Sequence, residues 1–108
     1  MFSLRIPARD RHPEIRLALL RRIGSELVFR LRRVIISPQP DHRFGKLRSS
    51  VARVMRSLPE AEMKIVVLRF HRVGKADVRH GPVAVVWILE IIRSVLQPHA
   101  DVAMRFAS

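Results

Sequence analysis

Residues 46 to 70 read KLRSSVARVMRSLPEAEMKIVVLRF, and the two halves of this segment carry different patterns. From Leu47 to Leu58 the apolar residues recur every three or four positions, which is the spacing of one helical face. Residues 63–70 are rich in β-branched side chains and apolar on both sides, which is typical of a buried strand. Pro59 separates the halves, because a residue before proline is pushed out of the helical region. The segment therefore predicts a helical or extended piece followed by a strand.

The patterns on either side of this segment also favour strands. Residues 15–19 alternate apolar and other side chains, and residues 27–36 alternate before ending in a β-branched run. A helix with Ser25 as its N-cap is an alternative for the second of these. Residues 82–88 are a further strand candidate, although residues 83–96 also fit one amphipathic helix. These patterns predict several strands beside the helical spacing of residues 47–58.

The length and the turn signals predict a single domain over residues 1–108. Residues 1–13 carry two prolines and mixed charges, so we expect a loose N-terminal arm. Residues 37–45 read SPQPDHRFG and predict a loop. This loop would free residues 46–58 to act as a switch segment, extended in one state and helical in another.

The apolar content of the chain is high for its length. Hydrophobic residues make up 48% of 108 residues, which favours self-association or a bound apolar ligand. Residues 65–70 and 83–89 are apolar on both faces, and a strand of that kind must be covered twice. We therefore predict a homodimer. The longest nearly apolar run, residues 83–96, is shorter than the roughly 20 residues that cross a membrane.

The charge of the chain is strongly positive, with a formal net charge of +12 and a pI of about 11.9. Such a field attracts nucleic acid, anionic lipid headgroups or acidic protein surfaces. A small nucleic-acid-binding module is therefore an alternative function, although 6% aromatic residues leave few side chains for base stacking. Two arginine clusters could follow phosphates: Arg30, Arg32 and Arg33, and Arg48, Arg53 and Arg56.

Signals for catalysis are weak in the sequence. The chain has no cysteine, no nucleophile motif and no glycine-rich phosphate loop, and its five histidines lack metal-ligand spacing. We expect no enzymatic activity, no metal and no cofactor.

Residues 58–70, LPEAEMKIVVLRF, resemble the start of the promoter-reading domain of bacterial sigma factors. That domain continues into a recognition helix with polar and basic residues that reach base edges. Here the sequence continues as PVAVVWILEII, which is apolar and expected to be buried. The resemblance therefore ends after these residues.

A second resemblance covers more of the chain. Residues 3–22, SLRIPARDRHPEIRLALLRR, place a proline before an alternating apolar segment, and residues 47–60 and 82–88 add a central segment and a valine-rich segment. With these features the chain resembles the internal accessory proteins of SARS-related betacoronaviruses, which are read from an alternative frame within the nucleocapsid gene. An overprinted frame would also explain why all basic residues except three lysines are arginine. The matching residues are Leu4, Arg5, Ile6, Pro13, Ile15, Leu17, Ala18, Leu47, Ala52, Arg53, Ser57 and Leu58.

This resemblance implies an all-β fold, an intertwined, homodimeric β-sandwich-like arrangement that encloses an apolar central tunnel. The tunnel would hold a lipid or fatty-acid-like ligand. The central segment could instead become helical and bind in the groove of an import receptor of the mitochondrial outer membrane. The protein would then act in the host cytoplasm, at a membrane or at the mitochondrial outer surface, and would dampen innate immune signalling.

The expected lipid-binding residues are alternate positions on the predicted strands, and the expected partner-binding residues lie in the switch segment. The family's serine near the start of the central segment falls on Arg48, with two serines directly after it. The lipid-binding set is Leu17, Leu19, Leu68, Phe70, Val85 and Trp87, and the partner-binding set is Leu47, Ser49, Ser50, Val51, Met55 and Leu58.

Overall fold

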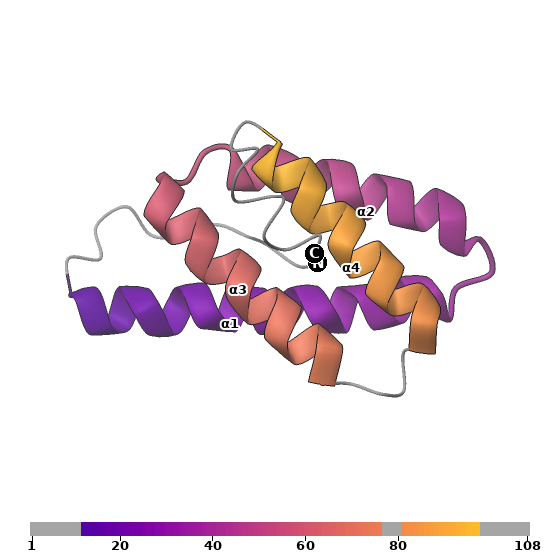
Figure 1. The fold of residues 1–108 in the computed structure, drawn as a ribbon, viewed down its shortest axis with the longest axis horizontal. Coiled ribbons are helices and arrows are strands. Elements are labelled where there is room, and N and C mark those ends of the chain that lie inside the picture. The colour runs from indigo at the N-terminus through magenta and orange to yellow at the C-terminus, as the bar shows by residue number, and fades with distance from the viewer. Residues whose placement is uncertain (1–11, 77–80, 98–108) are drawn as a thin grey trace.

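The computed structural model describes residues 12–76 and 81–97, and these residues form four helices (Figure 1). No strand occurs in this part of the chain. The predicted all-β fold, with its sandwich of strands around a central tunnel, is therefore wrong, and the fold is all-helical. The helices are α1 (Pro13–Ile35), α2 (Pro40–Met55), α3 (Glu60–Ala76) and α4 (Gly81–Leu96).

A proline stands at the start of every helix. Pro13 and Pro40 are the first residues of α1 and α2, Pro59 directly precedes α3, and Pro82 is the second residue of α4. Proline is favoured there because its fixed φ suits a helix and the first turn needs no backbone N–H donor. The prolines that suggested breaks in the sequence therefore mark helix starts.

Charged residues at the helix ends support the same boundaries. Acidic side chains near the N-terminus of a helix and basic side chains near its C-terminus interact favourably with the helix dipole. The first turns of three helices are acidic (Glu14 in α1, Asp41 in α2, Glu60 and Glu62 in α3), and the last turns of all four are basic (Arg32 and Arg33, Arg53, Lys75, and Arg93).

The connection between α1 and α2 is shorter than the loop expected over residues 37–45. It covers only residues 36–39, because Pro40 already belongs to α2. At its start the Ser37 hydroxyl donates a hydrogen bond to the carbonyl oxygen of Val34 at 2.7 Å. The N-terminal arm expected over residues 1–13 lies almost wholly outside the described residues.

Helical packing overrides the strand propensity of residues 63–70. The buried residues of α3 recur at intervals of three and four, which places them on one helical face. A valine costs at most about 0.7 kcal/mol in helix propensity relative to alanine, whereas burying its side chain contributes about 1.5–3 kcal/mol. Burial therefore decides the conformation. The buried residues are Met63, Val66, Val67, Phe70 and Gly74 in α3, and Ala84, Ile88, Ile91, Ile92, Val95 and Leu96 in α4.

The helices pack around one shared core. Helix α1 packs against α3 and α2, and α4 packs against the same two helices. In Figure 1, α3 crosses α1 and α4 lies across α2. Buried apolar side chains from all four helices join in this core. Much of the apolar content that suggested a second subunit is thus buried within one chain, and the homodimer stays a prediction.

Helices α1 and α3 lie close together at Gly24. A Cβ atom at this position would lie 2.7 Å from Cβ of Arg69 and 2.9 Å from the carbonyl oxygen of Val66. Beside it, Nε of Arg69 donates a hydrogen bond to the Ser25 hydroxyl at 3.1 Å. Glycine therefore allows the two backbones to meet without a side chain between them.

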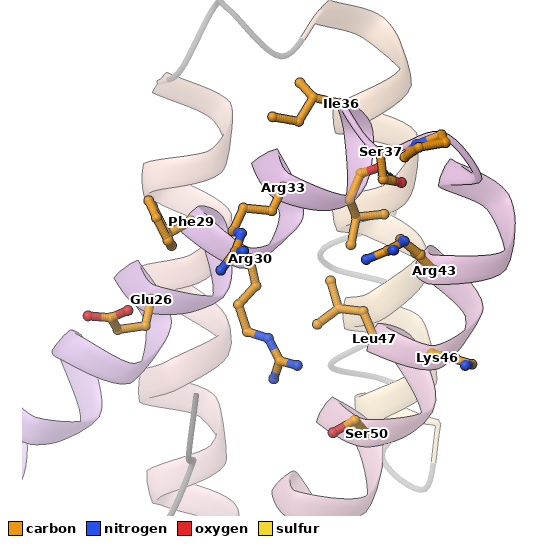
Figure 2. Close-up of a pocket in the computed structure, with 12 residues that line it drawn as sticks. Glu26, Phe29, Arg30, Arg33, Ile36, Ser37, Arg43, Lys46, Leu47 and Ser50 are labelled. Atoms are coloured by element: carbon orange, nitrogen blue, oxygen red, sulfur yellow. Dashed lines mark hydrogen bonds between the residues drawn. The ribbon is translucent and has the colours of Figure 1, made fainter. Parts of the chain in front are cut away.

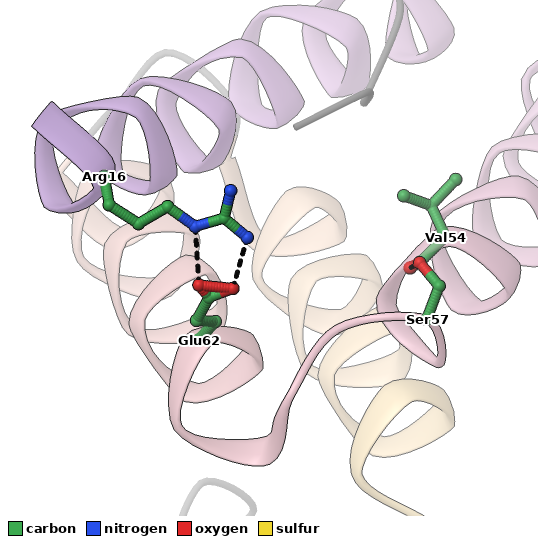
Figure 3. A network of polar contacts seen from close by, with 4 residues as sticks. All are labelled: Arg16, Val54, Ser57 and Glu62. Carbon is green, nitrogen blue, oxygen red and sulfur yellow. Dashed lines mark hydrogen bonds and ion pairs between the residues drawn. The ribbon is translucent and has the colours of Figure 1, made fainter. Parts of the chain in front are cut away.

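An ion pair joins the beginnings of the same two helices (Figure 3). Arg16 donates from Nε to Oε2 of Glu62 at 2.7 Å and from Nη2 to Oε1 at 2.6 Å. The side chains are only 23% and 17% exposed. The hydrogen bonds from Arg16 hold the pKa of Glu62 below its ordinary value of 4.5, although burial acts in the opposite direction. Figure 3 also shows the end of α2, where the Ser57 hydroxyl donates to the Val54 carbonyl oxygen at 2.6 Å.

We predict that Gly24→Ala lowers the free energy of unfolding by about 1–2 kcal/mol, because overpacking outweighs the gain in helix propensity. Gly45→Ala is the matched control, since a Cβ there meets no atom within 4 Å. It should raise the free energy of unfolding by up to about 1 kcal/mol. Urea unfolding followed by circular dichroism measures both. Equal effects of the two substitutions would contradict the close approach at Gly24.

We predict that Glu62→Gln lowers the free energy of unfolding by about 1–2 kcal/mol near neutral pH, because a charge-assisted pair is lost. The lowered pKa means that the pair stabilises the fold above about pH 4.5, and that this contribution is lost as pH falls through the folded-state value. The difference between wild type and variant should therefore shrink in acid. Glu60→Gln, in an exposed pair with Lys64, should cost less than about 0.5 kcal/mol. A pH-independent loss for Glu62→Gln would contradict this assignment.

Candidate functional site

The C-terminal half of α1 and the N-terminal half of α2 border an open groove of about 800 Å³ (Figure 2). Four cationic side chains and one carboxylate line it. Figure 2 shows Arg30 and Arg43 projecting into the space between the two helices, with Phe29 at the α1 edge. The charged lining residues are Arg30, Arg33, Arg43, Lys46 and Glu26.

The amphipathic pattern of each helix places these cations at the groove. In α1, Val28 and Leu31 are buried in the core, which leaves Arg30 and Arg33 on the groove side. In α2, the buried face begins at Leu47, beside Lys46. The core that holds α1 and α2 together thus also presents their basic side chains to one space.

Most of this positive charge is not neutralised within the described residues. Arg33, Arg43 and Lys46 are exposed, and none forms an ion pair with a residue in 12–76 or 81–97. Arginine keeps its charge at every physiological pH and can donate to phosphate or carboxylate oxygens in pairs. The groove is therefore suited to an anionic ligand with several oxygen atoms.

The outer face of α2 continues the basic surface toward α4. A shallow depression of about 490 Å³ lies there, with Arg53 and Arg56 among its lining residues. In it, Arg48 donates to Glu90 at 3.1 Å, and Arg93 lies 3.6 Å from the same carboxylate. Helix α2 thus carries cations on both sides, but the α4 side is partly neutralised by Glu90.

An aromatic pair fixes α2 against α4. The rings of Phe44 and Trp87 are stacked, with centroids 4.5 Å apart and planes inclined by 12°. Phe44 lies between the groove residues Arg43 and Lys46 in the sequence. The stack therefore fixes the part of α2 from which these two cations project.

Among the described residues away from the groove, one histidine has a pKa that is lowered by burial. His71 on α3 is half-buried, and burial, followed by the charge of Lys75, lowers its pKa below 6.5. The lowered pKa favours the neutral imidazole, so His71 contributes little to the positive surface near pH 7. No group of three or more metal-ligating side chains occurs in residues 12–76 and 81–97. The absence of enzymatic activity stays a prediction.

The structure places the expected lipid-binding residues on three helices, α1, α3 and α4, and buries them to different degrees. Residues two apart share a face on a strand, but on a helix they are separated by about 200°. On α3, for example, Phe70 is buried whereas Leu68 is 41% exposed. The tunnel that suggested a lipid ligand belonged to the predicted β-sandwich, which is wrong. A lipid ligand itself stays a prediction. The other four positions, Leu17, Leu19, Val85 and Trp87, are half-buried on α1 and α4.

The expected partner-binding stripe is helical, but its apolar residues pack into the chain's own core. Leu47, Val51 and Met55 are buried, and Leu58 is half-buried against the same cluster. Binding to an import receptor would require this stripe to leave the core, and it stays a prediction. The two serines of the set differ, because Ser49 is exposed and Ser50 lines the groove.

Sequence reasoning missed the α2 side of the groove. The predicted phosphate contacts include Arg30 and Arg33 of α1, whereas Arg43 lies in the predicted loop and Lys46 belongs to neither arginine cluster. The signal for both was Pro40 followed by Asp41, a proline and an acid at a helix start. A helix beginning there places Arg43 and Lys46 one turn apart.

No family model, curated protein or solved structure matches the chain. The resemblance to the coronavirus accessory proteins is therefore not tested by these comparisons and stays a prediction, although the fold that it implies is wrong. Over residues 12–76 and 81–97, no helix combines the length and the hydropathy that a bilayer crossing requires.

We predict that Phe44→Leu lowers the free energy of unfolding by about 1 kcal/mol through loss of the aromatic stack. It should also change the emission of Trp87, the only tryptophan of the chain. Phe29→Leu is the matched control, because Phe29 is 54% exposed. The control should leave stability and emission unchanged. Thermal unfolding and tryptophan fluorescence test both variants, and an unchanged emission spectrum for Phe44→Leu would contradict the stacked geometry.

Proposed function

We propose that the domain binds nucleic acid through its phosphate backbone, using the groove between α1 and α2. The observation that carries this proposal is the meeting of four cations from two helices, with Glu26 the one carboxylate among the described residues that line the groove. Three of the four are arginines, which suit the oxygens of phosphate better than a point charge does.

The shape of the basic surface favours a linear polyanion. Helix α2 has 16 residues and is therefore about 24 Å long, a distance that corresponds to about seven phosphates of one strand. Cations extend along it from Arg43 in the groove to Arg53 and Arg56 near its end. A chain of evenly spaced phosphates could contact this whole length.

An anionic membrane is supported less well. Helices that bind membranes in this way place a broad apolar face into the lipid beside their basic residues. Here the apolar face of α2 is buried, since Leu47, Val51 and Met55 pack in the core. The exposed residues of α2 are all polar or charged, which fits phosphates in water.

We predict that Arg33→Gln/Arg43→Gln/Lys46→Gln weakens binding to a labelled DNA or RNA oligonucleotide at least about tenfold at roughly 0.1 M salt. All three side chains are exposed, so stability should be retained. The slope of log affinity against log salt should also fall by about 2–3 for the three lost contacts. Fluorescence anisotropy over a salt series measures both quantities.

The matched control removes the same number of charges elsewhere, as Arg21→Gln/Arg22→Gln/Arg72→Gln. These arginines are exposed and do not line the groove. The control should retain most of the affinity and salt dependence. Equal losses in the two triple variants would mean that net charge alone drives binding, and would overturn the groove as the site. Binding to anionic vesicles but not to oligonucleotides would overturn the proposal itself.

A further inference from the structure

We infer that the groove selects single-stranded over double-stranded nucleic acid, because Phe29 offers an exposed aromatic face beside the phosphate-binding cations. This inference rests on the proposed function and adds the strand type to it. The other exposed apolar side chains of the described residues do not indicate a ligand as clearly. On α4, for instance, Val83 and Val86 are exposed, but nothing in the structure indicates what would cover them.

Phe29 differs from the other aromatic side chains of residues 12–76 and 81–97. It is 54% exposed, whereas Phe70 is buried and Phe44 and Trp87 stack on each other. Figure 2 shows Phe29 on α1, at the edge of the groove beside Arg33 and Arg30. The ring is therefore available to a ligand that the neighbouring cations hold.

Exposed apolar and charged side chains alternate along the C-terminal part of α1. Phe29 is followed one turn later by Arg33, and Ile36 follows at the end of the helix with 83% of its surface exposed. Seven residues correspond to about 10 Å along the helix axis. A flexible strand could place a base on Phe29, a phosphate at Arg33 and a further base against Ile36.

Base stacking distinguishes the two strand types. In a duplex, the base faces are covered by neighbouring base pairs, so an aromatic side chain cannot stack without opening the helix. In a single strand the faces are accessible, and stacking on an aromatic side chain strengthens binding with little sequence preference. Cations alone would bind both forms, so Phe29 is the residue expected to separate them.

The test compares labelled oligo(dT) of about 15 nucleotides with a duplex of the same length, using the whole chain and fluorescence anisotropy. The wild type should bind oligo(dT) more tightly than the duplex at equal salt. Phe29→Leu should weaken oligo(dT) binding about 5- to 10-fold and leave duplex binding unchanged, because the ring is lost while apolar bulk is kept. Phe29→Tyr should retain the wild-type affinity, since it preserves the aromatic face.

The outcomes separate this inference from the proposed function. If Phe29→Leu leaves oligo(dT) binding unchanged while the groove triple variant still weakens it, the groove binds phosphates but Phe29 does not stack, and the inference is overturned. The inference is also overturned if the duplex binds as tightly as oligo(dT). If neither oligonucleotide binds at low salt, both the proposed function and the inference fail. Thermal unfolding of each variant confirms that the protein under test is folded.

Discussion

The contact between α1 and α3 is the constraint on which the arrangement of the other helices depends. It is the most extensive contact between helices in the described residues, and Gly24 leaves room for the backbone of α3 beside α1. The ion pair between Arg16 and Glu62 fixes the beginnings of both helices. With this pair of helices in place, α2 and α4 complete the core by packing against each other and against one helix of the pair.

The groove follows from this packing. Helix α1 gives its buried face to α3 and α2, so its remaining face carries Arg30 and Arg33 beside the start of α2. Helix α2 is held in turn by the stack of Phe44 on Trp87, which links it to α4. The cations are thus placed by elements that are themselves fixed in the core. The candidate site is a consequence of how the core is shared among the helices, and residues 36–38 of the α1–α2 connection complete its lining.

The sequence has helical patterns in several segments, but the strand propensity of its β-branched residues favoured a different prediction. The helical spacing from Leu47 to Leu58 correctly indicated most of α2, and a helix over residues 83–96 was an open alternative that matches α4. Residues 63–70 were assigned to a strand because valine and isoleucine favour strands, a preference that depends strongly on burial. The prolines were interpreted as breaks, although acids after Pro13 and Pro40 indicated helix starts. The arginine-rich composition indicated a basic surface. The groove, however, depends on how far apart α1 and α2 lie, and no local sequence pattern gives that distance.

The cations around the groove also affect the free protein. Arg30, Arg33, Arg43 and Lys46 line one space, so the folded chain brings like charges closer together than an extended chain does. Such self-repulsion destabilises a compact state and is reduced when salt screens it. Salt should therefore stabilise the free protein, whereas it weakens the binding of a polyanion. A bound polyanion would reduce the same repulsion. Ligand binding and salt screening would therefore stabilise the folded domain in the same way, by offsetting the repulsion among these cations.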